Sequence, residues 1–235
     1  MKSISERSYG ARIGNAESMV AALLTFRDYQ PIKPEYSISS FTDLINTTKG
    51  FNNTVAGNKQ AYSLAVENRI QVFDKGQYSI DKVLSPVNGT VKVIYGRISK
   101  EARDVAGIIS KIRGANNRKK VNVKSDQAIV SQSYQSYNSK AQFFADMIVN
   151  LTNFGTNYQP TQGEVKIAAL NDLYTIAVGA NNLVMNSFSN FVQTNATRID
   201  SYYALSQMAV SIKDSVKAQY GFGSPEYQLI KGLKV

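Results

Sequence analysis

The sequence of 235 residues contains no cysteine, no histidine and no tryptophan. Without cysteine it can form no disulfide framework, thiolate nucleophile, zinc ribbon or iron–sulfur site. Without histidine it can form no Ser-His-Asp triad, imidazole metal site, histidine pH switch or helical Glu-x-x-His di-iron centre. We therefore expect no metal and no cofactor, because the remaining reactive groups are carboxylates, lysines, tyrosines and hydroxyls.

Long apolar runs are absent as well. The longest, Met19–Leu24, has six residues, whereas a membrane-spanning helix needs about 20. The N-terminal segment has no apolar core after Lys2 and so lacks the pattern of a secretory signal. The sequence therefore predicts a cytoplasmic protein that neither enters nor crosses a membrane.

The chain matches itself in two collinear halves, which predicts a tandem duplication. The matches begin at an offset of 128 residues, shift to 129 after a one-residue insertion, and shift to 125 after a four-residue deletion. We predict a first helical repeat over 8–113, a basic and polar linker over 114–135, and a second helical repeat over 136–235. Matching pairs include Tyr9/Tyr137, Met19/Met147, Phe26/Phe154, Pro31/Pro160, Asp43/Asp172, Asn52/Asn181, Arg69/Arg198, Val91/Val216, Tyr95/Tyr220 and Ser99/Ser224.

Apolar residues at helical spacing predict four helices in each repeat. The expected helices span about 10–27, 35–72, 78–95 and 99–112 in the first repeat, and about 138–154, 164–198, 202–220 and a shorter segment from 224 in the second. Only the stretch 121–124 has a strand-like pattern. We predict an all-α fold, a tandem duplication of a four-helix unit that forms one pseudo-two-fold bundle or two packed bundles.

Capping and breaking residues set the expected helix ends. Pro86 lies inside an expected helix and should kink or break it. Thr161 and Glu164 have the spacing of a capping box at the start of the second repeat's long helix. The other boundary residues are Pro31 and Pro160 after the first helices, Gly96 and Gly221 after the third, and Ser99 and Ser224 before the fourth.

Positive charge is concentrated in one segment. Of the formal net charge of +10, +8 lies between Lys92 and Lys124, where ten basic residues face two acidic ones. Such a segment is either a solvated connector or a surface that binds a phosphate polymer. It has no interleaved aromatic residues from 100 to 124 and no sequence-reading motif, so nucleic-acid binding would be nonspecific. The candidate polyanion-binding residues are Arg97, Lys100, Arg103, Lys111, Arg113, Arg118, Lys119, Lys120 and Lys124.

Paired asparagines interrupt the apolar stripe of the long helix in each repeat. Asn52 and Asn53 match Asn181 and Asn182. A buried amide at such a position can fix the register between helices at some cost in stability. A polar pocket at the bundle centre is the alternative, and we interpret the four residues as structural.

Arg69 and Arg198 extend the same stripe. They either pair with a carboxylate such as Asp43 or Asp172, or extend to solvent at a helix end, which costs less. We interpret both arginines as structural. Asp43 and Asp172 also form the one conceivable carboxylate pair for acid–base catalysis, but they have no third polar partner at a recognisable spacing. The sequence thus predicts no enzyme.

The segments Tyr95 to Glu101 and Tyr220 to Glu226 share the pattern Tyr-Gly-x-x-Ser-x-Glu. The second contains Ser-Pro-Glu-Tyr over 224–227, and it resembles the C-terminal segment of uncharacterised all-helical bacterial proteins. The first departs from that pattern with Ser-Lys-Glu-Ala over 99–102. The resemblance covers a short part of each repeat, and it implies a helical bundle without implying an activity.

The leading hypothesis is a non-enzymatic helical module that binds a macromolecular partner or assembles with itself. A duplicated scaffold without a catalytic constellation motivates it, together with 14 tyrosines, a residue type suited to half-buried interfaces. The alternative is sequence-nonspecific binding of nucleic acid or another polyanion through 97–124. Membrane action is disfavoured, because no long apolar hairpin is present.

Overall fold

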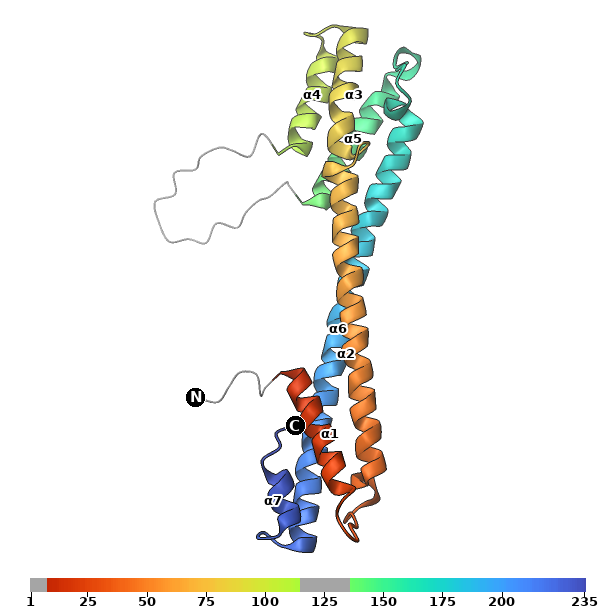
Figure 1. Cartoon of the computed structure of the whole chain (residues 1–235). Helices are drawn as coiled ribbons and strands as arrows, with labels where there is room; N and C mark the ends of the chain where they lie inside the picture. The colour runs from red at the N-terminus through yellow and green to blue at the C-terminus, as the bar shows by residue number, and fades with distance from the viewer. Residues whose placement is uncertain (1–7, 115–135) are drawn as a thin grey trace, which may run out of the picture. The chain divides into compact units, whose positions relative to one another are not determined.

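A computed structural model describes residues 8–114 and 136–235 (Figure 1). These residues form helices and turns and no strand, which confirms the all-α prediction. The strand-like stretch 121–124 lies outside the described residues. Among the helices described, none combines the length and the apolar character that crossing a bilayer requires.

The helices follow the expected order along the chain. In the first half, α1 spans Tyr9–Leu23, α2 spans Ile38–Ile70, α3 spans Ile80–Tyr95 and α4 spans Lys100–Ile112. In the second half, α5 spans Tyr137–Asn153, α6 spans Ile167–Tyr220 and α7 spans Pro225–Lys231. Short helical turns lie at Pro34–Tyr36, Gln71–Lys75, Gly155–Asn157 and Gly163–Val165.

The helix α6 corrects one expectation, because it continues through 199–201, where two helices were expected. In the first half, the π-helical turn Gln71–Lys75 and a turn at 76–79 separate α2 from α3. The second half is four residues shorter at this point, which is about one helical turn. The deletion removes the break and leaves the apolar stripe in register, so that the helix runs on.

The capping residues behave mostly as expected. The hydroxyls of Ser99 and Ser224 accept hydrogen bonds from the third residue after them, and Gly96 and Gly221 end their helices with φ of 94° and 98°. The capping box at Thr161 is wrong, because α6 begins only at Ile167, after a short 3-10 turn.

Pro86 does not break α3, which runs through it. Its ring lies partly exposed on the side of the helix away from Leu84 and Val87, which are fully buried. The lost backbone hydrogen bond therefore falls outside the core, and the buried stripe of α3 holds the helix together across the proline.

The described chain forms two compact units, each with its own core. Unit 1 comprises residues up to 60 together with 188–235, and unit 2 comprises 61–187. Each unit therefore contains segments from both halves of the sequence, and α2 and α6 contribute to both.

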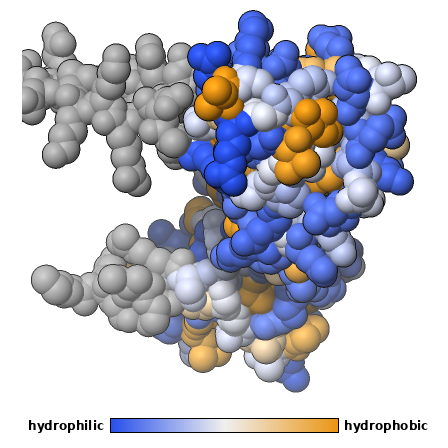
Figure 2. All heavy atoms as spheres, turned by 90° about the horizontal axis from the view of Figure 1, so that it is seen from above, coloured by the Kyte–Doolittle hydropathy of each residue, from blue (hydrophilic) through white to orange (hydrophobic). Residues whose placement is uncertain are grey.

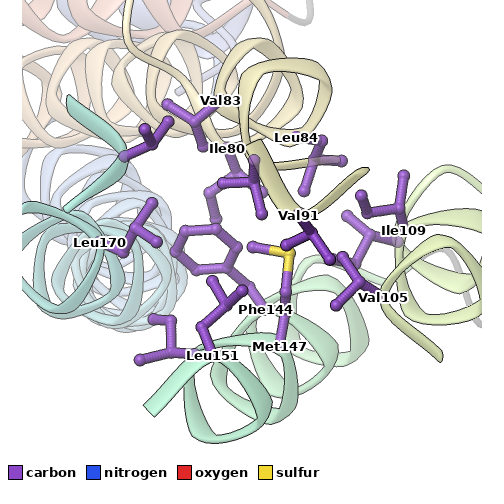
Figure 3. Close-up of a cluster of buried hydrophobic side chains, with 14 of the residues drawn as sticks. Ile80, Val83, Leu84, Val91, Val105, Ile109, Phe144, Met147, Leu151 and Leu170 are labelled. Atoms are coloured by element: carbon purple, nitrogen blue, oxygen red, sulfur yellow. The ribbon is translucent and has the colours of Figure 1, made fainter. Parts of the chain in front are cut away.

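Unit 2 has a core of aliphatic and aromatic side chains (Figure 3). Residues Phe144, Met147 and Leu151 of α5 point into its centre, where α3 and α4 supply valines and isoleucines and α6 supplies Leu170. On α3 the fully buried residues recur at positions 80, 84, 87 and 91, the spacing of one helix face. Each such side chain contributes about 1.5–3 kcal/mol on burial.

Unit 1 is built in the same way from α1, α7 and parts of α2 and α6. Met19 and Leu23 of α1 are buried against Leu205 and Ile212 of α6, and Ile230 of α7 is fully buried in the same cluster. Helix α7 is short, and its N-terminal Ser224 cap and Pro225 favour its first turn.

Candidate functional site

A layer of polar and aromatic side chains lies at the N-terminal end of α1 in unit 1. Ser8 caps α1, accepting from the Ala11 backbone N–H at 3.2 Å, and so places Tyr9 at the first helical residue. The ring of Tyr9 packs against that of Tyr202, with centroids 4.4 Å apart. On Tyr9 lies the guanidinium of Arg198, 4.3 Å from the ring centroid. The negatively polarised face of the ring attracts the guanidinium cation.

Tyr202 is the centre of this layer and is almost completely buried. Its hydroxyl donates to the Tyr9 carbonyl at 3.1 Å and accepts from Asn52 Nδ2 at 2.8 Å. Arg12 donates from Nη2 to the Tyr202 carbonyl at 2.9 Å and lies 4.7 Å from its ring centroid. The amide of Asn52 thus ties α2 to α6, the structural role predicted for it.

One turn before Asn52, a hydroxyl pair adds a second tie between α2 and α6. Thr48 Oγ1 and Ser201 Oγ lie 2.7 Å apart, and both residues are buried. The Thr48 hydroxyl also hydrogen-bonds the Leu44 carbonyl at 2.7 Å, so Ser201 is the donor of the pair.

Unit 2 has a corresponding layer at the start of α5. Ser136 caps α5, and Tyr137 follows it with Arg69 stacked 4.1 Å from its ring centroid. Phe73 packs edge-on against Tyr137 at 4.9 Å. Asp74 accepts from the Tyr137 hydroxyl at 3.3 Å and from Lys140 Nζ at 2.7 Å. Burial, and then the charge of Asp74, raise the pKa of Tyr137, which keeps its hydroxyl protonated as a donor.

The asparagine pairs differ in their partners. Asn181 donates to Asn138 Oδ1 at 3.0 Å, because unit 2 has Phe73 where unit 1 has the hydroxyl of Tyr202. Asn53 and Asn182 are exposed. Within the described residues, Asn52 Oδ1, Asn181 Oδ1 and the Nε atoms of both stacked arginines are buried without a hydrogen-bond partner.

Three of the predicted polyanion-binding residues share the solvent face of α4. Lys100, Arg103 and Lys111 lie opposite the buried face. Lys100 also donates to Asp104 at 2.6 Å, which raises its pKa, and Arg97 is exposed just before the helix. Arg118, Lys119, Lys120 and Lys124 lie outside the described residues.

Arg113 lies away from this face and donates to Asp81 at 3.3 Å and to Ser85 at 2.9 Å. Like Lys100, it therefore has a carboxylate beside it. Asp104 is already counted in the net charge of +8 between Lys92 and Lys124, whereas Asp81 lies outside that segment and offsets the charge of Arg113.

Two open depressions among the described residues of unit 2 are candidate small-molecule sites. One, of about 400 Å³, lies between α3 and the turn at 159–162, and Pro86 and Pro160 are among its lining residues. The other, of about 380 Å³, is mainly apolar and includes Glu164 and Asp172 in its lining. Asp43 is not among the residues that line this depression. No metal-binding group of three acidic residues occurs in the part of the chain described.

The tyrosines beneath the arginines are the residues that sequence reasoning missed. Tyr9 and Tyr137 were recognised as a matching pair, as were Arg69 and Arg198. The two pairs were not connected, because the spacing along a helix shows which face is buried and does not show which helix covers it. Comparison with protein-family models, with curated proteins and with solved structures gives no match for this chain.

Proposed function

We propose that the chain is a non-enzymatic interaction module, built by tandem duplication of 8–113 as 136–235, that assembles with itself or binds a macromolecular partner. The observation that carries this proposal is an exposed apolar face on α6. Phe188, Val192, Ile199 and Tyr203 recur at helical spacing there, and each is about half or more exposed. Contiguous apolar surface of this kind marks interaction sites.

Reciprocal contacts support the duplication. Phe26 packs edge-on against Tyr220 at 5.9 Å, and the matching Phe154 packs against Tyr95 at 4.9 Å. Each contact joins the two halves. In the first contact the phenylalanine belongs to the first half, and in the second contact it belongs to the second half. A pseudo-two-fold arrangement requires this pattern, in which residue i contacts residue j of the other half and the reverse.

One further pair of contacts exchanges roles between the halves, and another pair repeats within each half. Arg198 stacks on Tyr9 while Arg69 stacks on Tyr137. Within each half, the hydroxyls of Tyr29 and Tyr158 donate to the carbonyl seven residues later, at 3.3 and 2.9 Å. These matching residues thus occupy similar surroundings in both halves, which fits a structural role. Residues that differ between the halves are therefore the better candidates for a binding function.

The rest of the visible surface supports a binding role less strongly. Figure 2 shows one face in which hydrophilic side chains predominate and apolar ones form small separate patches. Val93 and Ile98, near the end of α3, are 85% and 89% exposed. Scattered apolar residues are ordinary on a protein surface.

The test is to measure the mass of the full chain by light scattering from micromolar to high concentration, and to use immobilised chain to capture partners. We expect either a concentration-dependent increase in mass or the specific capture of a macromolecule. A chain that remains a monomer at every concentration and captures nothing would contradict the proposal.

A second candidate function is polyanion binding, favoured by the face of Lys100, Arg103 and Lys111 on α4. It predicts affinity for random-sequence duplex DNA that falls steeply with salt, because binding releases counterions. Changing Arg103 and Lys111 to alanine should weaken binding, whereas Lys59→Ala on α2 should not. Absence of binding at low salt would remove this candidate. A triple Arg118, Lys119 and Lys120 to alanine variant tests the remaining basic residues.

A further inference from the structure

The apolar face of α6 in unit 1 contains a narrow stripe, and Val210, 51% exposed, lies on the same face two turns beyond it. We define the α6 stripe as Phe188, Val192, Ala196, Ile199 and Tyr203. At 100° per residue these five positions fall within an arc of about 80°, and they extend over about 22 Å of helix. The side chains of Val192 and Ile199 are 47% and 50% exposed, and Tyr203 is 67% exposed. Phe188 is 49% exposed beside its contacts within the chain.

Charge is depleted around the stripe. Between Asp172 and Lys213, α6 carries only Arg198 and Asp200. Helix α6 thus differs from an ordinary surface helix, whose solvent face is charged. Depletion of charge around exposed aromatic and aliphatic residues is the composition of an interface core.

Three positions on the same face of α2 are polar, although α2 matches α6 in the comparison of the two halves. At the offset of 129, Lys59, Ser63 and Glu67 stand where α6 has Phe188, Val192 and Ala196. All three α2 residues are exposed. The scaffold therefore does not require apolar residues at these three positions, whereas the stripe residue Ile199 is matched by Ile70. The exposed apolar residues of α6 at the three positions are explained if a partner covers them.

We propose that the α6 stripe binds the α6 stripe of a second copy of this chain, in antiparallel orientation across a two-fold axis; this rests on the proposed interaction function. The positions of the stripe are symmetric about the point between Asn195 and Ala196. An antiparallel pair places Phe188 opposite Tyr203 and Val192 opposite Ile199 of the second copy. Aromatic meets aromatic and aliphatic meets aliphatic, which is the self-complementarity that a two-fold interface requires.

The residues at the symmetry point are small. Ala196 lies there, and the Asn195 side chain is drawn back toward Arg198, whose Nη2 donates to Asn195 Oδ1 at 2.5 Å. A small residue at the crossing point allows two helix axes to approach to about 8 Å. The larger side chains on both sides can then interdigitate.

The exposed area suits a dimer of moderate affinity. From the exposed fractions above and full side-chain areas of about 150–250 Å², the stripe offers about 400 Å² of apolar surface per copy. A standard interface buries about 800 Å² per partner, of which roughly 60% is apolar. The stripe therefore supplies most of the apolar core, and we expect dissociation in the micromolar range.

The first test compares Val192→Glu with Ser63→Glu in the full chain by analytical ultracentrifugation. The two positions match in the two halves, and both side chains are exposed, so folding should survive in each; circular dichroism checks this. Val192→Glu places a carboxylate against Ile199 of the second copy twice per dimer. We expect it to raise the dimer dissociation constant on the order of 100-fold or more, and Ser63→Glu to leave it unchanged.

The second test uses the absence of cysteine, because an introduced thiol is then unique. Ala196→Cys lies about 1.5 Å along the axis from its symmetry mate and should form a disulfide-linked dimer rapidly. Glu67→Cys, the matching exposed position on α2, should not. A mixture of Val192→Cys and Ile199→Cys chains should cross-link faster than either chain alone, since only the mixed pair lies face to face.

The outcomes separate the dimer geometry from the proposed function. Loss of association in Val192→Glu together with cross-linking at 196 supports the antiparallel pair. Association that survives Val192→Glu overturns the stripe and leaves self-assembly intact. Equal cross-linking of all single-cysteine chains overturns the antiparallel orientation. A wild-type chain that is monomeric at high concentration overturns the inference, and the capture experiment then decides the proposed function.

Discussion

The guanidinium of Arg198 lies 4.3 Å from the ring centroid of Tyr9 and donates to Asn195 Oδ1. This contact fastens the first turn of α1 to α6. A cation over a half-buried ring contributes about 0.5–2 kcal/mol, and the arginine stem also covers apolar surface.

We expect Arg198→Ala to lower the free energy of unfolding by about 1–2 kcal/mol. Arg198→Lys keeps the charge and loses the planar stack, so its effect should be intermediate. Urea denaturation measures both. Arg97→Ala, at an exposed position before α4, is the control and should change stability by less than about 0.5 kcal/mol. Equal effects at 97 and 198 would show that the stack contributes nothing.

Cleavage between the two halves should leave them associated. A specific protease site inserted in 115–135 would divide the chain into an N-terminal and a C-terminal fragment. Each compact unit contains segments of both, so separating the fragments would expose both cores. We expect the fragments to co-elute on size exclusion in buffer and to separate in urea. Separation in buffer would contradict the composition of the two units.

Tyr158 makes stability depend on alkaline pH. Burial raises its pKa to about 12 from the usual 10.0, and its hydroxyl donates to the Val165 carbonyl at 2.9 Å. Because the folded pKa is the higher one, this contribution is complete below about pH 10 and is lost as the pH rises through about 12. Tyr158→Phe should therefore flatten the decline of thermal stability over this interval.

Tyr29→Phe is the matched control for that measurement. The pKa of Tyr29 is raised by burial and by Tyr220, but its hydroxyl is 3.3 Å from the Tyr36 carbonyl and less enclosed. We expect less flattening than in Tyr158→Phe. At neutral pH, Tyr158→Phe should cost about 1 kcal/mol, since a buried carbonyl loses its donor. An unchanged alkaline profile in Tyr158→Phe would assign the decline to other groups.

Replacing Gly221 or Gly57 by alanine should change the free energy of unfolding in opposite directions. Gly221 ends α6 with φ of 98°, where a side chain is strained, and Gly221→Ala should cost about 1–2 kcal/mol. Gly57 lies exposed inside α2 and has open space at its Cβ position, so Gly57→Ala should stabilise by about 0.5–1 kcal/mol. Differential scanning calorimetry measures both, and a common sign would contradict the helix ends assigned here.

Most helices could be predicted from the sequence, but the helices against which they pack could not. The starts of α4 and α7 follow from the caps Ser99 and Ser224, and the ends of α3 and α6 follow from Gly96 and Gly221, because these signals are local. The sequence analysis did not predict the continuity of α6, because it expected the break that follows Phe73 in the first half at the matching place in the second half. The four residues lost there equal one helical turn, so the deletion itself held the signal.

The candidate surface could likewise be predicted only in part from the sequence. The apolar residues of the α6 stripe are visible in the sequence, but so is the buried stripe on the opposite side of the same helix. With apolar residues on two faces, periodicity cannot say which face the fold covers. Val192 and Tyr203 are exposed because α1 and α2 pack against the opposite side of α6, and this packing cannot be inferred from periodicity.

The composition of unit 1 has a consequence for synthesis on the ribosome. Unit 2 is one continuous stretch, 61–187, whereas α1 packs on residues of α6 from Tyr202 onward. At about 5–20 residues per second, α1 emerges about 10–40 s before these partners do. During that interval Met19 and Leu23 can contact Phe41 and Ile45 of α2 but not the α6 and α7 members of their cluster, so these side chains stay only partly covered until α6 has been synthesised.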